Sequence, residues 1–169
     1  MTAGLVNPLW SLDMQRFLGV VLAVLALLVP FAGSSSAAVH PVARMVPSTY
    51  SHEAVHATNV ARLDHGRKAL SHSSCLQRKA RAQAKRMARQ KRMFHQALSP
   101  VLHQCGMNFV GENVAFGYPN GDKVVWKGWM KSPPHRRNLL NRKYHLIAVG
   151  SAKASNGSWY VSQVFGRHR

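Results

Sequence analysis

Regularly spaced apolar positions predict two long helices in the chain beyond residue 50. Between residues 51 and 64 they recur at helical spacing (Ala54, Ala57, Val60 and Ala61), and Gly66 is placed to end that helix. A second stripe predicts a helix over residues 74–94, formed by Leu76, Ala80, Ala84, Met87 and Ala88. Shorter helices are expected over residues 122–131 and 132–141, with Asp122 and Ser132 as their N-caps.

The C-terminal part of the chain has the alternation of a β-hairpin. Residues 146–153 and 158–165 predict two strands, and Asn156-Gly157 between them is a favoured hairpin turn. Trp159, Val161 and Phe165 alternate on one side of the second strand. Residues 98–108 contain a proline and a glycine and are expected to form a loop. Helices together with an antiparallel hairpin predict an α+β domain.

The N-terminal segment has the pattern of a secretory signal. Residues 17–32 carry no charge, Arg16 precedes them, and Ser36-Ala37-Ala38 resembles a signal-peptidase site. We therefore expect a signal peptide over residues 1–38, a linker over 39–50 and one domain over 51–169, in a secreted protein that could remain at the cell envelope. The alternative, an uncleaved anchor, stays open, although sixteen residues with Pro30 are short for a span of about 20.

The charge of the chain is strongly unbalanced. Lys and Arg number 23 and Asp and Glu number 5, which gives a net charge of +18 and favours polyanionic partners. The second predicted helix carries eight of the cations: Arg78, Lys79, Arg81, Lys85, Arg86, Arg89, Lys91 and Arg92. This face is either a solvated surface or a docking surface for an anionic cell-envelope polymer or lipid. No base-reading signature accompanies it, so sequence-specific nucleic-acid binding is not expected.

The chain has two cysteines, Cys75 and Cys105. In an exported protein, they predict one disulfide, whose loop of about 30 residues is worth roughly 3–4 kcal/mol in the chain-entropy model. The alternative is a catalytic thiol at Cys105 beside His103, which an oxidising compartment and an available partner disfavour.

Several separated segments then line up with one family. They are an N..R...G...L pattern at Asn59, Arg62, Gly66 and Leu70, the segment GENVA at 111–115, WMKSPPHRRNLL at 129–140, and QVFG at 163–166. In this order they resemble the CAP superfamily (cysteine-rich secretory proteins, antigen five and pathogenesis-related proteins), and most of all its bacterial SCP-like extracellular branch. The match covers about residues 55–166, and it implies a three-layer α-β-α sandwich around a small antiparallel sheet.

The resemblance also implies a central cleft that holds a divalent metal in some members. The matching positions here are His95, Glu112 and His135. The animal and plant branches supply a second acid from the helix after GEN, whereas residues 124–131 of this chain contain none. Pro134 also stands where the bacterial pattern usually has glycine.

Independent reasoning from the residues also singles out Glu112. Asp64 and Asp122 lie near predicted helix ends and Glu53 in a predicted first turn, but Glu112 lies between apolar residues and needs a buried partner. His135 falls in the first turn of its predicted helix, which favours a neutral imidazole. Two histidines and a glutamate form a zinc ligand set with an open position. The alternative is a hydrogen-bonded cluster that locks the fold.

Three functions remain open after this reasoning. The first is a secreted, monomeric binding module without catalysis, with a cleft that is structural or binds zinc. The second is a metal-dependent or acid–base hydrolase using the same cleft, although the chain has neither a G-x-S-x-G nor an H-E-x-x-H motif. The third is a toxin-like or antimicrobial protein that acts through its charge alone.

Overall fold

The computed structural model describes residues 45–168. The expected signal peptide and its cleavage site, and most of the expected linker, lie outside these residues. Within residues 45–168 no helix is long and apolar enough to cross a membrane.

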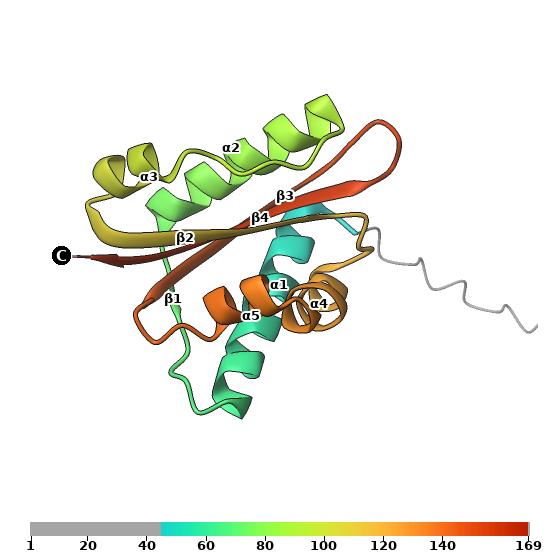
Figure 1. The fold of residues 1–169 in the computed structure, drawn as a ribbon. Helices are drawn as coiled ribbons and strands as arrows, with labels where there is room; N and C mark the ends of the chain where they lie inside the picture. The colour runs from blue at the N-terminus through green and yellow to red at the C-terminus, as the bar shows by residue number, and fades with distance from the viewer. Residues whose placement is uncertain (1–44, 169) are drawn as a thin grey trace, which may run out of the picture. The chain divides into compact units, whose positions relative to one another are not determined.

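The described part of the chain forms helices, short helical turns and strands (Figure 1). In chain order they are α1 (Pro47–Asp64), β1 (Ser71–His72), α2 (Ser74–Gln90), α3 (Leu98–Gln104), β2 (Met107–Phe116), α4 (Gly121–Lys123), the π-helical turn η1 (Val124–Gly128), the 3-10 turn η2 (Trp129–Lys131), α5 (Pro133–Leu139), β3 (Leu146–Lys153) and β4 (Trp159–His168). The predicted strand 146–153 is confirmed, and so is the hairpin that follows it.

The four strands form one sheet in the order β1-β3-β4-β2. The long strands pair antiparallel, and the two-residue β1 pairs parallel with β3. Figure 1 shows α2 on one side of the sheet and α1 on the other. This arrangement confirms the three-layer α-β-α sandwich that the resemblance implies. It also leaves β2 as an edge strand.

Apolar side chains fill both faces of the sheet. Leu76 of α2 packs with Ala148 and Val164 on one face. On the other, Tyr50 of α1 belongs to a larger cluster with Phe165. Successive residues of a strand point to opposite faces, so each strand contributes to both cores. Trp159 and Val161 lie in the same cluster as Phe165, as their alternation predicts.

The predicted disulfide is present and joins Cys75 to Cys105. It ties the first turn of α2 to the end of α3. Residues 98–104 were expected to be a loop, and this expectation is wrong. Pro100 lies in the first turn of α3, where a missing N–H is tolerated, and Val101 is buried against the core around Leu76.

Two predicted helix boundaries are also wrong. The second helix ends at Gln90 because Lys91 adopts a left-handed φ of 49°, and the N–H groups of Lys91 and Arg92 cap its last carbonyls. The residue that caps α4 is Asn120, whose Oδ1 accepts the Lys123 N–H at 2.8 Å, and not Asp122. Ser132 is the N-cap residue of α5, as predicted, although its side chain makes no cap hydrogen bond with a described residue.

The first helix begins at Pro47, four residues before the expected Ser51. Glu53 therefore lies beyond the first turn, and its predicted role at the helix dipole is wrong. Its carboxylate instead accepts the backbone N–H of Gly121 at 3.0 Å. The interaction ties α1 to the start of α4.

Close packing of α2 on β3 predicts a large effect at Gly150. A Cβ there would lie 2.3 Å from the backbone of Ala80 and Arg81, which a packed helix is unable to move away. Gly150→Ala should therefore lower the free energy of unfolding by about 3 kcal/mol, measured by urea denaturation. Gly157→Ala, in an open turn with φ 84°, is the control and should cost only about 1 kcal/mol. Equal losses would contradict the steric explanation.

Candidate functional site

The edge strand β2 presents two buried polar residues to opposite faces of the sheet. Glu112 points to the α2 side, where it meets His95 and Gln96 from the segment after α2 and Ser162 from β4. Asn113 points to the other side, where it contacts α5. The site is therefore built around both sides of one strand.

The Glu112 carboxylate is almost fully buried, with its side chain 1% exposed. Its Oε2 accepts hydrogen bonds from the ring Nδ1 of His95 at 2.8 Å and the backbone N–H of Gln96 at 3.1 Å. Its Oε1 accepts from the Gln96 amide at 2.8 Å and the Ser162 hydroxyl at 2.7 Å. Glu112 thus has the hydrogen-bond partners that its burial requires, of which Ser162 is buried and the His95 side chain is 58% exposed. The contact with His95 is an ion pair when the imidazole is protonated, and no other carboxylate within residues 45–168 pairs with a Lys, Arg or His side chain.

A second network holds α5 against the sheet. The Asn113 amide donates to the Gln163 side chain at 3.0 Å and to the backbone carbonyl of His135 at 3.2 Å. Asn138 donates to the Asn113 side chain at 2.9 Å. Gln163 in turn donates to Thr58 of α1 at 2.8 Å, so the network runs along one face of the sheet from α5 to α1.

His135 lies on the α5 side of the strand, and its ring Nδ1 is 2.9 Å from the Ser132 hydroxyl. Burial, and then the nearby charge of His95, lower the pKa of His135 below its ordinary value. A neutral imidazole was predicted from the position of His135 at a helix N-terminus, and the lowered pKa agrees with that prediction. The physical causes differ, however, because the pKa is lowered by burial and by the imidazole of His95.

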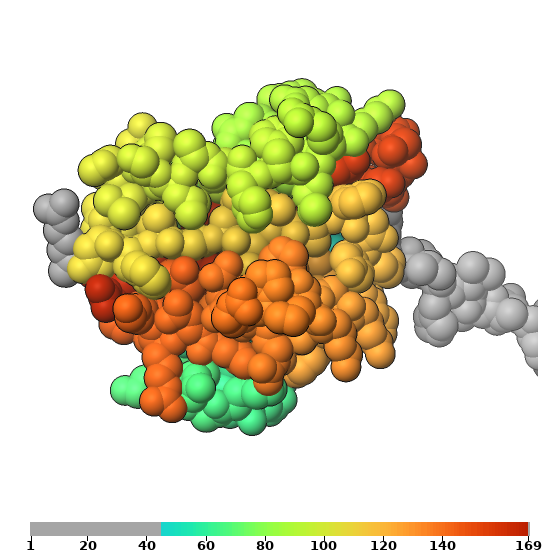
Figure 2. Space-filling view, viewed as in Figure 1, coloured from blue at the N-terminus to red at the C-terminus, as the bar shows by residue number. Residues whose placement is uncertain are grey.

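An apolar groove of about 240 Å³ adjoins His135. Its lining includes Met93, Val114, Phe116, Tyr118, Trp129 and Ser132. Met93 and Phe116 are 44% and 53% exposed, which is high for such large apolar side chains. Figure 2 shows this face, with the α2 region above the band formed by β2 and the α4–α5 region below it.

Within residues 45–168, no three His, Cys, Asp or Glu side chains are grouped closely enough to hold a metal ion. The structure gives the Glu112 oxygens four hydrogen-bond donors, and His135 lies across the strand from them. The two histidines have one property of metal ligands, because a hydrogen bond at Nδ1 orients each ring. Nε2 of each ring takes part in no hydrogen bond among the described residues and is left for a metal. Metal binding by His95, Glu112 and His135 stays a prediction.

Four members of these networks, Gln96, Ser162, Gln163 and Thr58, were not predicted as site residues from the sequence. Ser162 and Gln163 gave one signal, because two polar residues interrupt the apolar strand from Trp159 to Phe165. Gln96 gave none, since its position depends on where α2 ends.

The environment of His135 predicts a measurable titration. Its pKa, followed by NMR of the imidazole protons, should lie below 6.5. The folded state then binds fewer protons than the unfolded chain just below this pH, so this group makes the domain less stable as the pH falls. His95→Gln should raise the pKa of His135 partway, because burial remains. His103→Gln, on exposed α3, should leave it unchanged. A midpoint at or above 6.5 would contradict this account.

Comparisons with known proteins agree with this fold. A family profile described as the cysteine-rich secretory protein family matches residues 55–165. The uncharacterized protein YkwD of Bacillus subtilis (strain 168) is 33% identical over 127 residues, which are 71% of this chain and 48% of that protein.

Solved structures share the fold at lower identity. An extracellular protein containing an SCP domain from Bacillus anthracis has a TM-score of 0.63 and 24% identity over 72% of this chain and 41% of that chain. An outer surface protein from Borrelia burgdorferi has a TM-score of 0.62 and 19% identity over 68% and 90% of the two chains. This chain spans less than half the length of both Bacillus proteins. The family profile extends from α1 into β4, and the chain therefore belongs to the cysteine-rich secretory protein (CAP) family.

Proposed function

We propose that this CAP domain is a secreted binding module that attaches to an anionic cell-envelope polymer through the outer face of α2. The observation that carries the proposal is a stripe of exposed cations along that helix, none of which pairs with a carboxylate of residues 45–168. The description of one relative as extracellular and of another as an outer surface protein supports a location where such polymers occur.

The stripe follows from the helical period. Arg78, Arg81, Lys85 and Arg89 recur every three or four residues and are all exposed, while the opposite face of α2 is buried on the sheet. Like charges at this spacing oppose helix formation. No Lys or Arg within residues 45–168 forms a salt bridge, so the positive field of the stripe is not cancelled locally.

Two cations beside the stripe are held by amides. Lys79 donates to the Gln104 side chain, and Arg86 donates to Gln83. Arg92, just beyond the helix, lies 5.0 Å from the ring centroid of Phe94. These contacts orient cationic groups and leave their charge intact, which suits a surface that meets a flexible anionic chain.

Removal of three stripe charges tests the proposal. The variant Arg81→Gln/Lys85→Gln/Arg89→Gln should bind poly(glycerol phosphate) roughly a hundredfold more weakly, because each cation near an anionic surface contributes about 1 kcal/mol. Glutamine is a good helix former, so α2 should persist. Binding is measured by titration calorimetry at several salt concentrations.

The control for this test carries the same change in charge away from the α2 stripe and from the cationic pockets, Lys123→Gln/Lys127→Gln/Lys143→Gln. It should bind the polymer within about threefold of the unmodified domain, since long-range charge effects are screened beyond roughly 8 Å. Equal losses in both variants would mean that net charge alone acts. Tighter binding to phosphatidylglycerol vesicles than to the polymer would assign the face to a lipid surface instead.

We further propose that the cleft binds a divalent metal through His95 and His135. The support is that Nδ1 of each ring is engaged, by Glu112 and by Ser132. A carboxylate behind a histidine orients it and raises its basicity as a ligand. Two protein ligands are fewer than the three of common zinc sites, so a modest affinity is expected.

Zinc titration of the metal-stripped domain tests the cleft. His95→Ala and His135→Ala should each abolish one-to-one binding, and Glu112→Gln should weaken it about 10–100-fold through the lost orientation of His95. His103→Ala, on the exposed α3, should have no effect. Zinc binding that survives both cleft variants would place the metal elsewhere, and no binding by the folded domain would leave a structural cluster.

Hydrolysis is the second candidate function, and one observation favours it. The Ser132 hydroxyl makes no cap hydrogen bond at the start of α5. It pairs instead with His135 beside the apolar groove. A serine and a neutral histidine within hydrogen-bond reach form the core of a nucleophilic site. None of the hydrogen bonds among the described residues orients the other ring nitrogen, however, and this leaves the pair less complete than a catalytic triad.

A further inference from the structure

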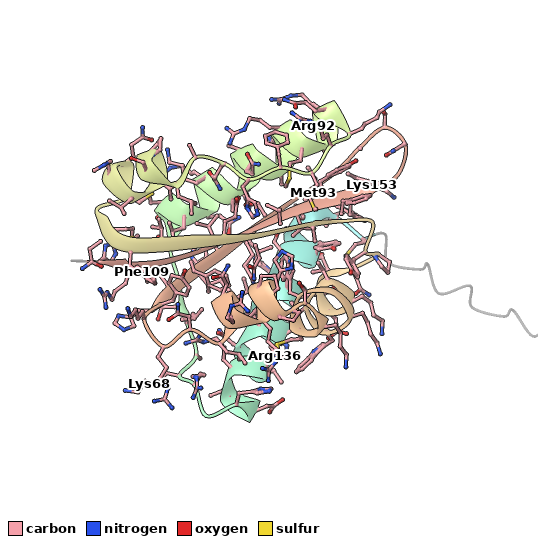
Figure 3. The ribbon with its side chains drawn as sticks, in the orientation of Figure 1. Lys68, Arg92, Met93, Phe109, Arg136 and Lys153 are labelled. Carbon is pink, nitrogen blue, oxygen red and sulfur yellow. A yellow bond between two sulfur atoms is a disulfide. The ribbon has the colours of Figure 1, made fainter. Side chains whose placement is uncertain are left out.

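A second cationic site lies at the other end of the molecule from the α2 cations. It is a pocket of about 580 Å³ formed by the end of α1, the segment that follows it, β1 and the loop between α5 and β3. Its lining contains Arg62, Arg67, Lys68, Arg142 and His145, together with Ser71 and Tyr144, and no carboxylate. In Figure 3, Lys68 and Arg92 lie at opposite ends of the molecule.

The pocket contains a buried charge without an ionic partner. Arg62 is 2% exposed, and no carboxylate within residues 45–168 forms a salt bridge with it. Its Nε donates to the carbonyl of Lys68 at 2.8 Å, and its Nη1 donates to the carbonyl of Asn141 at 3.0 Å and to that of Leu139. Carbonyl dipoles hold the guanidinium in place but leave its full charge uncompensated.

One nitrogen of Arg62 is left for another partner. None of the hydrogen bonds among the described residues uses Nη2. Nη2 is not among the buried polar atoms that lack a partner, and Arg62 lines the pocket, so we take Nη2 as the group that faces a ligand. A fixed guanidinium with a free N–H edge is suited to bind a multidentate oxyanion.

The neighbouring cations are also positioned. Arg67 donates through Nε to the carbonyl of Leu140 at 3.1 Å, which fixes it to the same loop. Burial, and then the charge of Arg67, lower the pKa of Arg62, so the two guanidinium groups repel each other. An anion between them would relieve that repulsion. Lys68 and Arg142 are exposed at the rim and complete a ring of positive charge.

We propose that this pocket binds a phosphate group carried by a small organic molecule or by the end of a polymer. Several convergent cations and the Ser71 hydroxyl favour a doubly charged oxyanion over a single carboxylate. The volume exceeds that of a bare phosphate and falls in the range of about 300–1,000 Å³ for small-molecule pockets. An adjoining hollow of about 610 Å³ shares Arg67 and adds Arg136 and Arg137, which gives a longer anionic ligand room to continue.

The site is tested with variants that spare its structural members. Lys68→Ala/Arg142→Ala removes two rim charges whose side chains make no hydrogen bond among the described residues, and Arg62 and Arg67 stay intact. Arg81→Ala/Lys85→Ala removes the same charge from the α2 stripe as the control. Inorganic phosphate, glycerol phosphate and a short glycerol phosphate oligomer are titrated by NMR and calorimetry at constant ionic strength.

Inorganic phosphate should saturate the pocket and shift the backbone resonances of Ser71 and His145. Its affinity should fall at least about tenfold in the pocket variant and less than about twofold in the control. Tighter binding of glycerol phosphate would identify a small-molecule ligand, and tighter binding of the oligomer a polymer end. Shifts that do not saturate, or equal losses in both variants, would overturn the proposal. The control changes only the α2 stripe, so a failure of the pocket proposal can be told apart from a failure of polymer binding by α2.

Discussion

A buried polar network through the edge strand β2 is the constraint on which this site depends. Glu112 and Asn113 are consecutive, so the pleat sends one side chain to each face of the sheet. Glu112 uses both carboxylate oxygens to hold the segment after α2, and Asn113 holds α5 through Asn138 and the carbonyl of His135. Burying a carboxylate or an amide without these partners would lower the stability of the fold by several kcal/mol. The segment after α2 and the helix α5 are therefore held in fixed positions relative to the strand. The positions of His95 and His135 on the two sides of the strand are a consequence of that fixation.

This basic domain has little charge compensation within residues 45–168, because it has few acids and they form few ion pairs. Of the four acids within residues 45–168, Glu112 is committed to the network and Glu53 to the backbone of Gly121. Asp64 and Asp122 are exposed, and neither forms a salt bridge with a described residue. Several of the cations instead contact carbonyls, amides and aromatic faces. Ion pairs thus add little to the cohesion of this fold, and its positive field stays available for anionic ligands.

Sequence reasoning predicted the features that depend on local periodicity or on one strong physical requirement. The β-hairpin, the buried face of α2, the disulfide and the need of Glu112 for a partner are examples. The layered architecture came from the family resemblance, because periodicity alone predicts only an α+β domain. What remained hidden depends on tertiary contacts. The end of α2 at Lys91, the partner of Ser132 and the carbonyl cage of Arg62 join residues whose proximity no local pattern encodes.

The two cationic surfaces differ in physical character. The α2 stripe is exposed, so its attraction to an anion is spread over several flexible side chains and is screened by salt. Arg62 is buried and held by carbonyls, so its interaction with an anion occurs at lower dielectric, is screened less and requires a definite geometry. The stripe can attract a polyanion without selecting its structure, whereas the pocket can select one group. A polymer with a phosphate end could engage both surfaces, and the affinity of the second contact would then depend on whether the chain spans the distance between them.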